Sequence, residues 1–251
     1  MRHMIRGVAL ACVALTLPAA TEAGAAPDRK ADYAALAELP DLSGVWSPDW
    51  GSLFASRGAA APTKPQFTPK AAKIVADYNA KQKEGENLQT DDANCIPPGM
   101  PRVMKMPYPI EFIVSPGRVT IATEAYEQVR RVYTDGRKLP DDPDPSFNGS
   151  SVGRWVNGGL EIDTIGVNPR VTIMPGLHPS EGMRIHERVT REGDDKLWIE
   201  TTITDPELFT QPFTQKQAYI RKPGWEIREY ICQENNKDHA DEFGRPSMDI
   251  N

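Results

Sequence analysis

The clearest structural signal in this chain is the stretch VGRWVNGGLEIDTI, which covers residues 152–165. Its second half, 160–165, alternates apolar and polar residues, a pattern typical of a half-buried strand. Between the two halves lies Asn157-Gly158-Gly159, and an Asn-Gly pair favours the backbone conformation of a tight hairpin turn. The stretch therefore predicts two antiparallel strands, 152–156 and 160–165, joined by a short turn.

The same two-residue period and recurring turn signals extend along the chain from Pro107. A second tight hairpin is expected at Ser115-Pro116-Gly117-Arg118. The other strands are expected at residues 41–46, 110–114, 119–123, 126–133, 183–190, 197–204, 217–221 and 226–232. A meander of this kind exposes two sheet edges, and closing it into a barrel removes both. We therefore expect a mainly β protein built as an antiparallel up-and-down barrel, with a sandwich as the alternative.

One α-helix is expected, early in the chain. Thr68 followed by Pro69 supplies an N-cap and a proline at the first helical position, and apolar residues at helical spacing continue to Lys83. The helix 69–83 belongs to a single barrel domain that covers residues 41–236. A barrel of more than eight strands usually retains an internal cavity for a small ligand.

The N-terminus predicts export. Residues 1–25 contain a basic start, an apolar run over 7–20 and small residues before the expected cleavage site, as in a secretory signal peptide. Residues 26–40 are expected to be a flexible leader and residues 237–251 a polar tail. The apolar run is too short for a bilayer-spanning helix, so we expect no membrane insertion and a periplasmic or secreted location.

The net charge and the cysteine count give two further expectations, one about binding partners and one about a disulfide. The formal net charge of −6 argues against nucleic acid or an anionic membrane as a partner. Cys95 and Cys232 remain after removal of the signal peptide, and an even count in an oxidising compartment predicts a disulfide between them. Two free thiols, one of them reactive, are the alternative.

The first expected strand carries a family resemblance. Gly44-Val45-Trp46 resembles the Gly-x-Trp opening of lipocalins and related calycin barrels. The resemblance implies a lipocalin-like barrel in which the Trp packs against an Arg of the last strands, here Arg221 or Arg228. The chain departs from that family because its helix precedes most strands and because Thr204-Asp205-Pro206 lacks the Tyr of the second family motif.

A longer resemblance covers nearly all of the chain after the signal peptide. It is carried by the segments 94–101, 130–137, 153–155, 160–164, 178–181, 185–188 and 230–236. Together these segments resemble a family of exported bacterial proteins that are mostly labelled hypothetical. The resemblance implies export and a β fold, and it implies no catalytic residue.

Glu187 is the first candidate catalytic residue. Alternation along the strand places Met183, Ile185, Glu187 and Val189 on one face. If that face lines the barrel, Glu187 is an inward carboxylate whose ionised form is disfavoured by burial, as general acid–base catalysis requires. The alternative is a solvated carboxylate or one paired with an Arg.

His178 and His186 are further catalytic candidates, because histidine exchanges protons near neutral pH. They lie close together in the sequence, with Glu181 between them. Two histidines and a carboxylate also suit a metal site, but the spacing matches no metal motif, and we expect neither a metal nor a cofactor.

A second group is expected to bind the ligand. Arg131 and Tyr133 share one face of their strand, with Arg130 and Val132 on the other, and together they suit a carboxylate or phenolate. Trp155 and Arg188 complete the candidate ligand-binding residues, with Trp155 suited to an apolar or aromatic ligand. A solvated strand face is the alternative for the charged members.

Two hypotheses for the function follow. In the first, a periplasmic barrel binds a small, partly apolar or aromatic organic molecule. In the second, a cofactor-independent lyase, isomerase or hydratase acts on such a molecule through Glu187, His178 or His186. Motifs for serine hydrolysis, phosphoryl transfer and nicotinamide binding are missing from the sequence, and Glu161 with Asp163 is only a weak glycosidase pair. The sequence leaves the ligand and the oligomeric state open.

Overall fold

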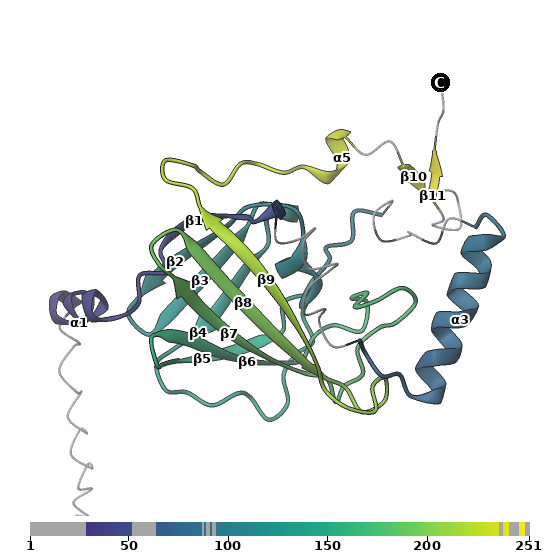
Figure 1. Cartoon of the computed structure of the whole chain (residues 1–251), viewed down its shortest axis with the longest axis horizontal. Helices are drawn as coiled ribbons and strands as arrows, with labels where there is room; N and C mark the ends of the chain where they lie inside the picture. The colour runs from purple at the N-terminus through teal and green to yellow at the C-terminus, as the bar shows by residue number, and fades with distance from the viewer. Residues whose placement is uncertain are drawn as a thin grey trace, which may run out of the picture.

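The computed structural model describes residues 29–51, 64–86, 88, 91, 94–235, 238–240 and 246–248. The signal peptide expected at 1–25 lies outside these residues. Figure 1 shows a barrel of strands at the centre of the molecule, with the long helix α3 (Pro69–Lys83) outside it.

Nine strands form a closed barrel in which each strand pairs with the next in sequence and β1 pairs with β9. They are β1 (Gly44–Pro48), β2 (Ile110–Ser115), β3 (Arg118–Thr123), β4 (Val129–Tyr133), β5 (Ser150–Val156), β6 (Gly159–Ile165), β7 (Arg184–Glu192), β8 (Lys196–Thr204) and β9 (Phe213–Arg221). This arrangement confirms the expected mainly β, lipocalin-like barrel. The hairpin turn at Asn157-Gly158 is also confirmed, since both residues have the positive φ angles that an Asn-Gly turn requires.

One junction of the barrel differs from a plain antiparallel meander, because β4 and β5 run parallel. They pair at only two positions, Val132 with Ser151 and Tyr133 with Val152. Residues 134–149 return the chain to the end at which β4 began. This segment contains three prolines, which cannot donate ladder hydrogen bonds, and it therefore runs as a loop.

The interior of the barrel is a packed core. On β7, Ile185, Glu187 and Val189 are buried while the residues between them are partly exposed, as alternation predicts. Apolar side chains from every strand except β5 are buried in one cluster with Leu42 and the 3-10 helix η2 (Arg102–Lys105). The barrel therefore encloses close-packed side chains around a few polar ones.

The helices lie outside the barrel. They are α1 (Arg29–Ala35), the 3-10 helix η1 (Leu36–Glu38), α3 (Pro69–Lys83), the 3-10 helix η3 (Ala125–Glu127) and α5 (Cys232–Asn235). Helix α3 has the predicted bounds, and the hydroxyl of Thr68 caps it by accepting a hydrogen bond from the Ala71 amide at 3.2 Å. No helix within the described ranges is long and apolar enough to cross a membrane.

The segments that flank the predicted domain contain short helices and strands as well. The expected flexible leader, 26–40, contains α1 and η1. The expected polar tail contains β10 (Asp238–Ala240) and β11 (Pro246–Met248), which pair with each other in a two-stranded sheet.

Trp46 makes the contact with an arginine that the lipocalin resemblance implies. Its ring is fully buried, its indole N–H donates to the Leu42 carbonyl at 2.9 Å, and the Arg221 guanidinium lies 4.6 Å from the ring centre. Arg221 also donates to the carboxylate of Asp41 at 3.0 Å. The expected Trp–Arg contact is confirmed for Arg221, whereas Arg228 contacts Glu124 through its backbone amide.

The predicted disulfide is confirmed between Cys95 and Cys232, which lie 137 positions apart. The strand expected at 226–232 is wrong, because the backbone is irregular from 222 to 231 and Cys232 begins α5. Pairing of β1 with β9 explains the difference, since it leaves no barrel edge to which another strand could add. The disulfide therefore ties the C-terminal segment to the segment before the barrel's second strand.

Candidate functional site

A pocket of about 760 Å³ opens at the parallel junction between β4 and β5, and we call it the seam pocket. Its apolar lining includes Tyr126, Val129, Tyr133, Leu139 and Phe147. Its polar lining includes Arg130, Asn148 and Ser151. The pocket combines aromatic and aliphatic side chains with a few polar groups, as small-molecule sites do.

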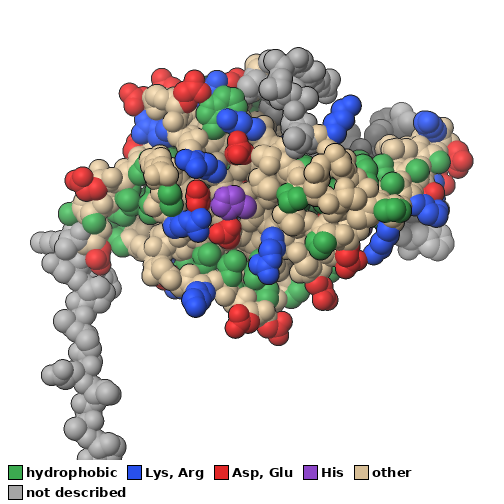
Figure 2. All heavy atoms as spheres, turned by 60° about the horizontal axis from the view of Figure 1, so that its bottom comes forward, with side chains coloured by type: hydrophobic (Ala, Val, Ile, Leu, Met, Phe, Trp, Pro, Cys, Tyr) green, Lys and Arg blue, Asp and Glu red, His purple; other side chains and the backbone are tan. Residues whose placement is uncertain are grey.

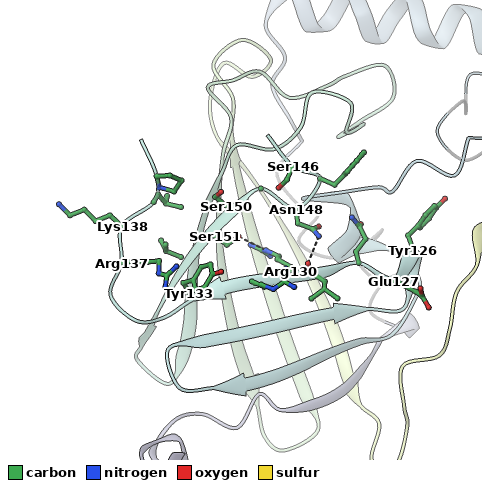
Figure 3. Close-up of a pocket in the computed structure, with 18 residues that line it drawn as sticks. Tyr126, Glu127, Arg130, Tyr133, Arg137, Lys138, Ser146, Asn148, Ser150 and Ser151 are labelled. Carbon is green, nitrogen blue, oxygen red and sulfur yellow. Dashed lines mark hydrogen bonds between the residues drawn. The ribbon is translucent and has the colours of Figure 1, made fainter. Parts of the chain in front are cut away.

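The short pairing of β4 with β5 creates this pocket. Backbone pairing begins only at Val132, so the first part of β4 has no strand beside it on that edge. Asn148 partly replaces the missing strand by donating from Nδ2 to the Val129 carbonyl at 3.5 Å. Figure 3 shows Asn148 next to Arg130 above β4, with the Tyr133–Arg137 pair at one end of the pocket and Tyr126 and Glu127 at the other.

Arg130 links the seam pocket to a polar cluster inside the barrel. Its guanidinium is buried, and its Nη2 donates to the Glu187 carboxylate at 2.5 Å and to Thr164 Oγ1 at 2.8 Å. Its Nε donates to Ser151 Oγ at 3.2 Å, and the two hydroxyl groups lie 2.8 Å apart. Side chains from β4, β5, β6 and β7 thus meet around one ion pair.

Three buried polar atoms of this region have no hydrogen-bond partner among the described residues. They are Arg130 Nη1, Glu187 Oε1 and Asn148 Oδ1. A buried polar atom without a partner costs about 1–3 kcal/mol, so native proteins usually pair such atoms with protein, water or ligand. Arg130 and Asn148 both line the seam pocket, which makes it the strongest candidate site in the described structure.

The lining of the pocket also includes several basic side chains. Arg131, Arg137 and Lys138 line it together with one acidic residue, Glu127. Arg137 stacks on Tyr133 with 3.8 Å between the guanidinium carbon and the ring centre. It also binds Asp135 through hydrogen bonds that lower the pKa of that carboxyl group and raise the pKa of the guanidinium. Tyr133, Arg137 and Asp135 therefore form one contact group at this end of the pocket.

The three candidate catalytic residues do not share a site. Glu187 faces the barrel interior and contacts Arg130, whereas His186 is on the opposite face of β7 and lies 2.8 Å from Asp163. His178 is in the loop before β7, where its Nδ1 lies 3.0 Å from the Val171 carbonyl. It lines a second pocket of about 550 Å³ with Lys105 and other residues. Glu187 and His186 thus lie on opposite faces of β7, as strand alternation predicts.

Of the four candidate ligand-binding residues, two line the seam pocket and two lie elsewhere. Arg131 and Tyr133 line the seam pocket. Trp155 is not part of the pocket lining and packs against the core. Arg188 lies on the outer face of the barrel, with its Nη1 3.6 Å from the Glu161 carboxylate. Glu161 also accepts from Arg154 at 2.6 Å on the same outer face, so its side chain takes part in a surface charge cluster. Figure 2 shows acidic and basic side chains interspersed on one face of the molecule.

Arg130 is the site residue that the sequence analysis did not select. Alternation placed it opposite Arg131, and an arginine that points into a barrel needs a carboxylate partner. Glu187 was the candidate inward carboxylate, but alternation did not assign the inward face of the strand that carries Arg130, so it did not pair the two residues. Asn148 and Ser151 carried no comparable signal, because their role depends on where the long loop rejoins the barrel.

The described residues contain no group of three or more His, Cys, Asp and Glu side chains placed to hold a metal ion. Comparison with known proteins adds no further assignment, since no protein-family model and no curated protein matches this chain.

Proposed function

We propose that this protein is an exported barrel that binds a small, partly aromatic organic molecule in the seam pocket. The observation that carries the proposal is the pocket of about 760 Å³, whose lining combines aromatic side chains with a buried arginine that has one donor without a partner among the described residues. A cavity of this size suits a small organic ligand. The disulfide supports export, because such bonds persist in oxidising compartments.

Binding is better supported than acid–base catalysis. An enzyme of the proposed class needs a proton-transferring group beside the substrate. Of the candidate catalytic residues, Glu187 is closest to the seam pocket, and its carboxylate is engaged by Arg130 beneath that pocket. The described lining of the seam pocket contains no histidine.

Native mass spectrometry of the protein purified gently from its own compartment tests the proposal. We expect a stoichiometric organic adduct. Val129→Trp fills the pocket and should abolish the adduct, because Val129 is in the lining and is 44% exposed. Ile113→Trp is the matched control, since Ile113 is a β-branched residue on β2 with 48% exposure and lies outside this pocket. An adduct that persists equally in both variants would contradict the assigned location.

A further inference from the structure

We propose that the ligand of the seam pocket is an aromatic carboxylate whose carboxylate group accepts a hydrogen bond from Arg130 Nη1. This inference rests on the proposed function and specifies the chemistry of the ligand. Three independent features support it: the unused hydrogen-bonding capacity of Arg130, the charge of the pocket lining, and the aromatic side chains of that lining.

The first feature is the guanidinium of Arg130. Its Nε and Nη2 are committed to Ser151, Thr164 and Glu187. Its Nη1 is buried and unpartnered within the described chain. A guanidinium has five N–H donors in a fixed plane, and carboxylate oxygens match them in geometry and charge. The ion pair with Glu187 therefore orients Arg130 and leaves Nη1 without an acceptor among the described residues.

The second feature is the local charge. The lining includes Arg130, Arg131, Arg137 and Lys138, with Glu127 as its acidic member. Arg130 is paired with Glu187 and Arg137 with Asp135, so the positive charge at the pocket comes from Arg131 and Lys138 and exceeds that of Glu127 by one, whereas the whole chain carries a formal charge of −6. Such an arrangement attracts a small organic anion and repels a cation. A neutral carbonyl compound would satisfy Arg130 Nη1 but would gain nothing from the other basic groups.

The third feature is the shape of the apolar lining. Tyr126 and Tyr133 lie at opposite ends of the pocket in Figure 3, and Phe147 adds a third aromatic ring to the lining. Asn148 lies between these ends, and its Nδ2 is a hydrogen-bond donor. Its long hydrogen bond to Val129 is easily exchanged for one to a ligand oxygen. An aromatic body with a carboxylate therefore fits both the rings and the polar floor.

Isothermal titration of the mature protein with three matched probes tests the inference. The probes are 3-phenylpropanoate, 3-phenylpropanamide and 3-phenylpropan-1-ol, which share one aromatic body and differ in the polar group. We expect the acid to bind at least about tenfold more tightly than either neutral probe, as a charge-assisted hydrogen bond provides. Equal binding by all three would overturn this inference and leave the proposed function standing.

Variants locate the carboxylate. Arg130→Met combined with Glu187→Leu removes both buried charges together, and it should weaken binding of the acid about tenfold to a hundredfold while changing binding of the amide little. Arg131→Met is the matched control, since Arg131 is the exposed neighbour on the same strand. Its smaller effect should vanish in 0.5 M salt, because salt screens exposed charges. A loss in the Arg131 variant as large as that in the double variant would overturn the inference.

Asn148→Ala provides a second variant in case the double variant does not fold. Asn148 is in a loop and is only partly buried, so its replacement should leave the barrel intact. We expect binding of the acid to weaken several-fold. Unchanged binding in this variant, together with failure of the acid to bind better than the amide, would place the ligand elsewhere and overturn the assignment.

Discussion

At the scale of single residues, the ion pair between Arg130 and Glu187 is the feature that most constrains the barrel interior. Both side chains are buried, and each has one unpartnered polar atom among the described residues. Removing one partner of a buried pair leaves an uncompensated charge and typically costs about 3–5 kcal/mol, whereas replacing both by apolar groups is often neutral. We therefore expect Arg130→Met alone to destabilise the protein strongly.

The double variant Arg130→Met with Glu187→Leu should recover most of that loss. Urea unfolding of the wild type, both single variants and the double variant measures the coupling directly. The expectation is wrong if the double variant is as unstable as the sum of the two single variants.

Tyr219 predicts a pH dependence. Burial raises the pKa of its phenol above the ordinary value of 10.0, and the nearby charge of Glu187 adds to this effect. The unfolded chain loses the proton near pH 10 while the folded protein keeps it. The free energy of unfolding is therefore unaffected by this group below pH 10 and falls above it, by up to about 1.4 kcal/mol per pH unit.

Tyr219→Phe separates this effect from those of other groups. The variant loses the hydrogen bond from the phenol to the Met104 carbonyl at 2.6 Å, so it should be less stable than the wild type near pH 8. Above pH 10 the difference between the two proteins should shrink. Urea unfolding at several pH values between 8 and 11 checks this, and parallel curves would contradict it.

The contacts of single residues also differ in how far the sequence predicts them. Strand alternation grouped Glu187 with Ile185 and Val189, and this face is buried, because the period of two is a local property. The alternative of a carboxylate paired with an Arg is the one found. Its partner Arg130 lies 57 positions away, and alternation alone cannot select one inward residue from another strand. His178 and His186 were grouped because they are close in the sequence. Closeness in sequence does not predict that a residue in a loop and a residue in the following strand face the same site.

At the scale of elements, the early helix is held by its first turn. Thr68 accepts from the Ala71 amide at 3.2 Å and donates its hydroxyl to the Glu207 carbonyl at 2.8 Å. The cap thus fixes both the start of α3 and its attachment to the loop after β8. Thr68→Ala should destabilise the protein by about 1–2 kcal/mol, and Thr68→Ser should retain most of the stability because the oxygen remains. Thermal unfolding of the two variants distinguishes them, and equal losses would argue against a capping role.

The strands themselves were largely predictable because each hairpin carries its own local turn signal. Asn157-Gly158-Gly159 and Ser115-Pro116-Gly117-Arg118 both join neighbouring antiparallel strands. The junction of β4 with β5 was not predictable in the same way, because the connecting loop of residues 134–149 gives no local indication of its direction of return. The strand expected at 226–232 was wrong because its existence depended on a free barrel edge rather than on its own residues.

At the scale of the whole molecule, the disulfide closes a loop that contains eight of the nine barrel strands, from β2 to β9. A bond that closes so long a loop limits the unfolded chain and typically contributes about 2–4 kcal/mol. Cys95→Ser and Cys232→Ser should each lower stability by that amount, and the double variant should be no less stable than either single variant. Guanidinium unfolding under non-reducing conditions measures this, and additive losses would contradict a shared bond.

The parallel junction follows from the number of strands in the closed ring. A circle of nine strands cannot alternate up and down throughout, since alternation around a ring needs an even count, and at least one pair of neighbours must point the same way. In this molecule eight neighbouring pairs are antiparallel and the mismatch falls on β4 and β5. The arithmetic of closure thus requires an irregular junction, and the loop connection places it where the pocket opens. A ring with one strand more or one fewer could be regular throughout and would have no need of that opening.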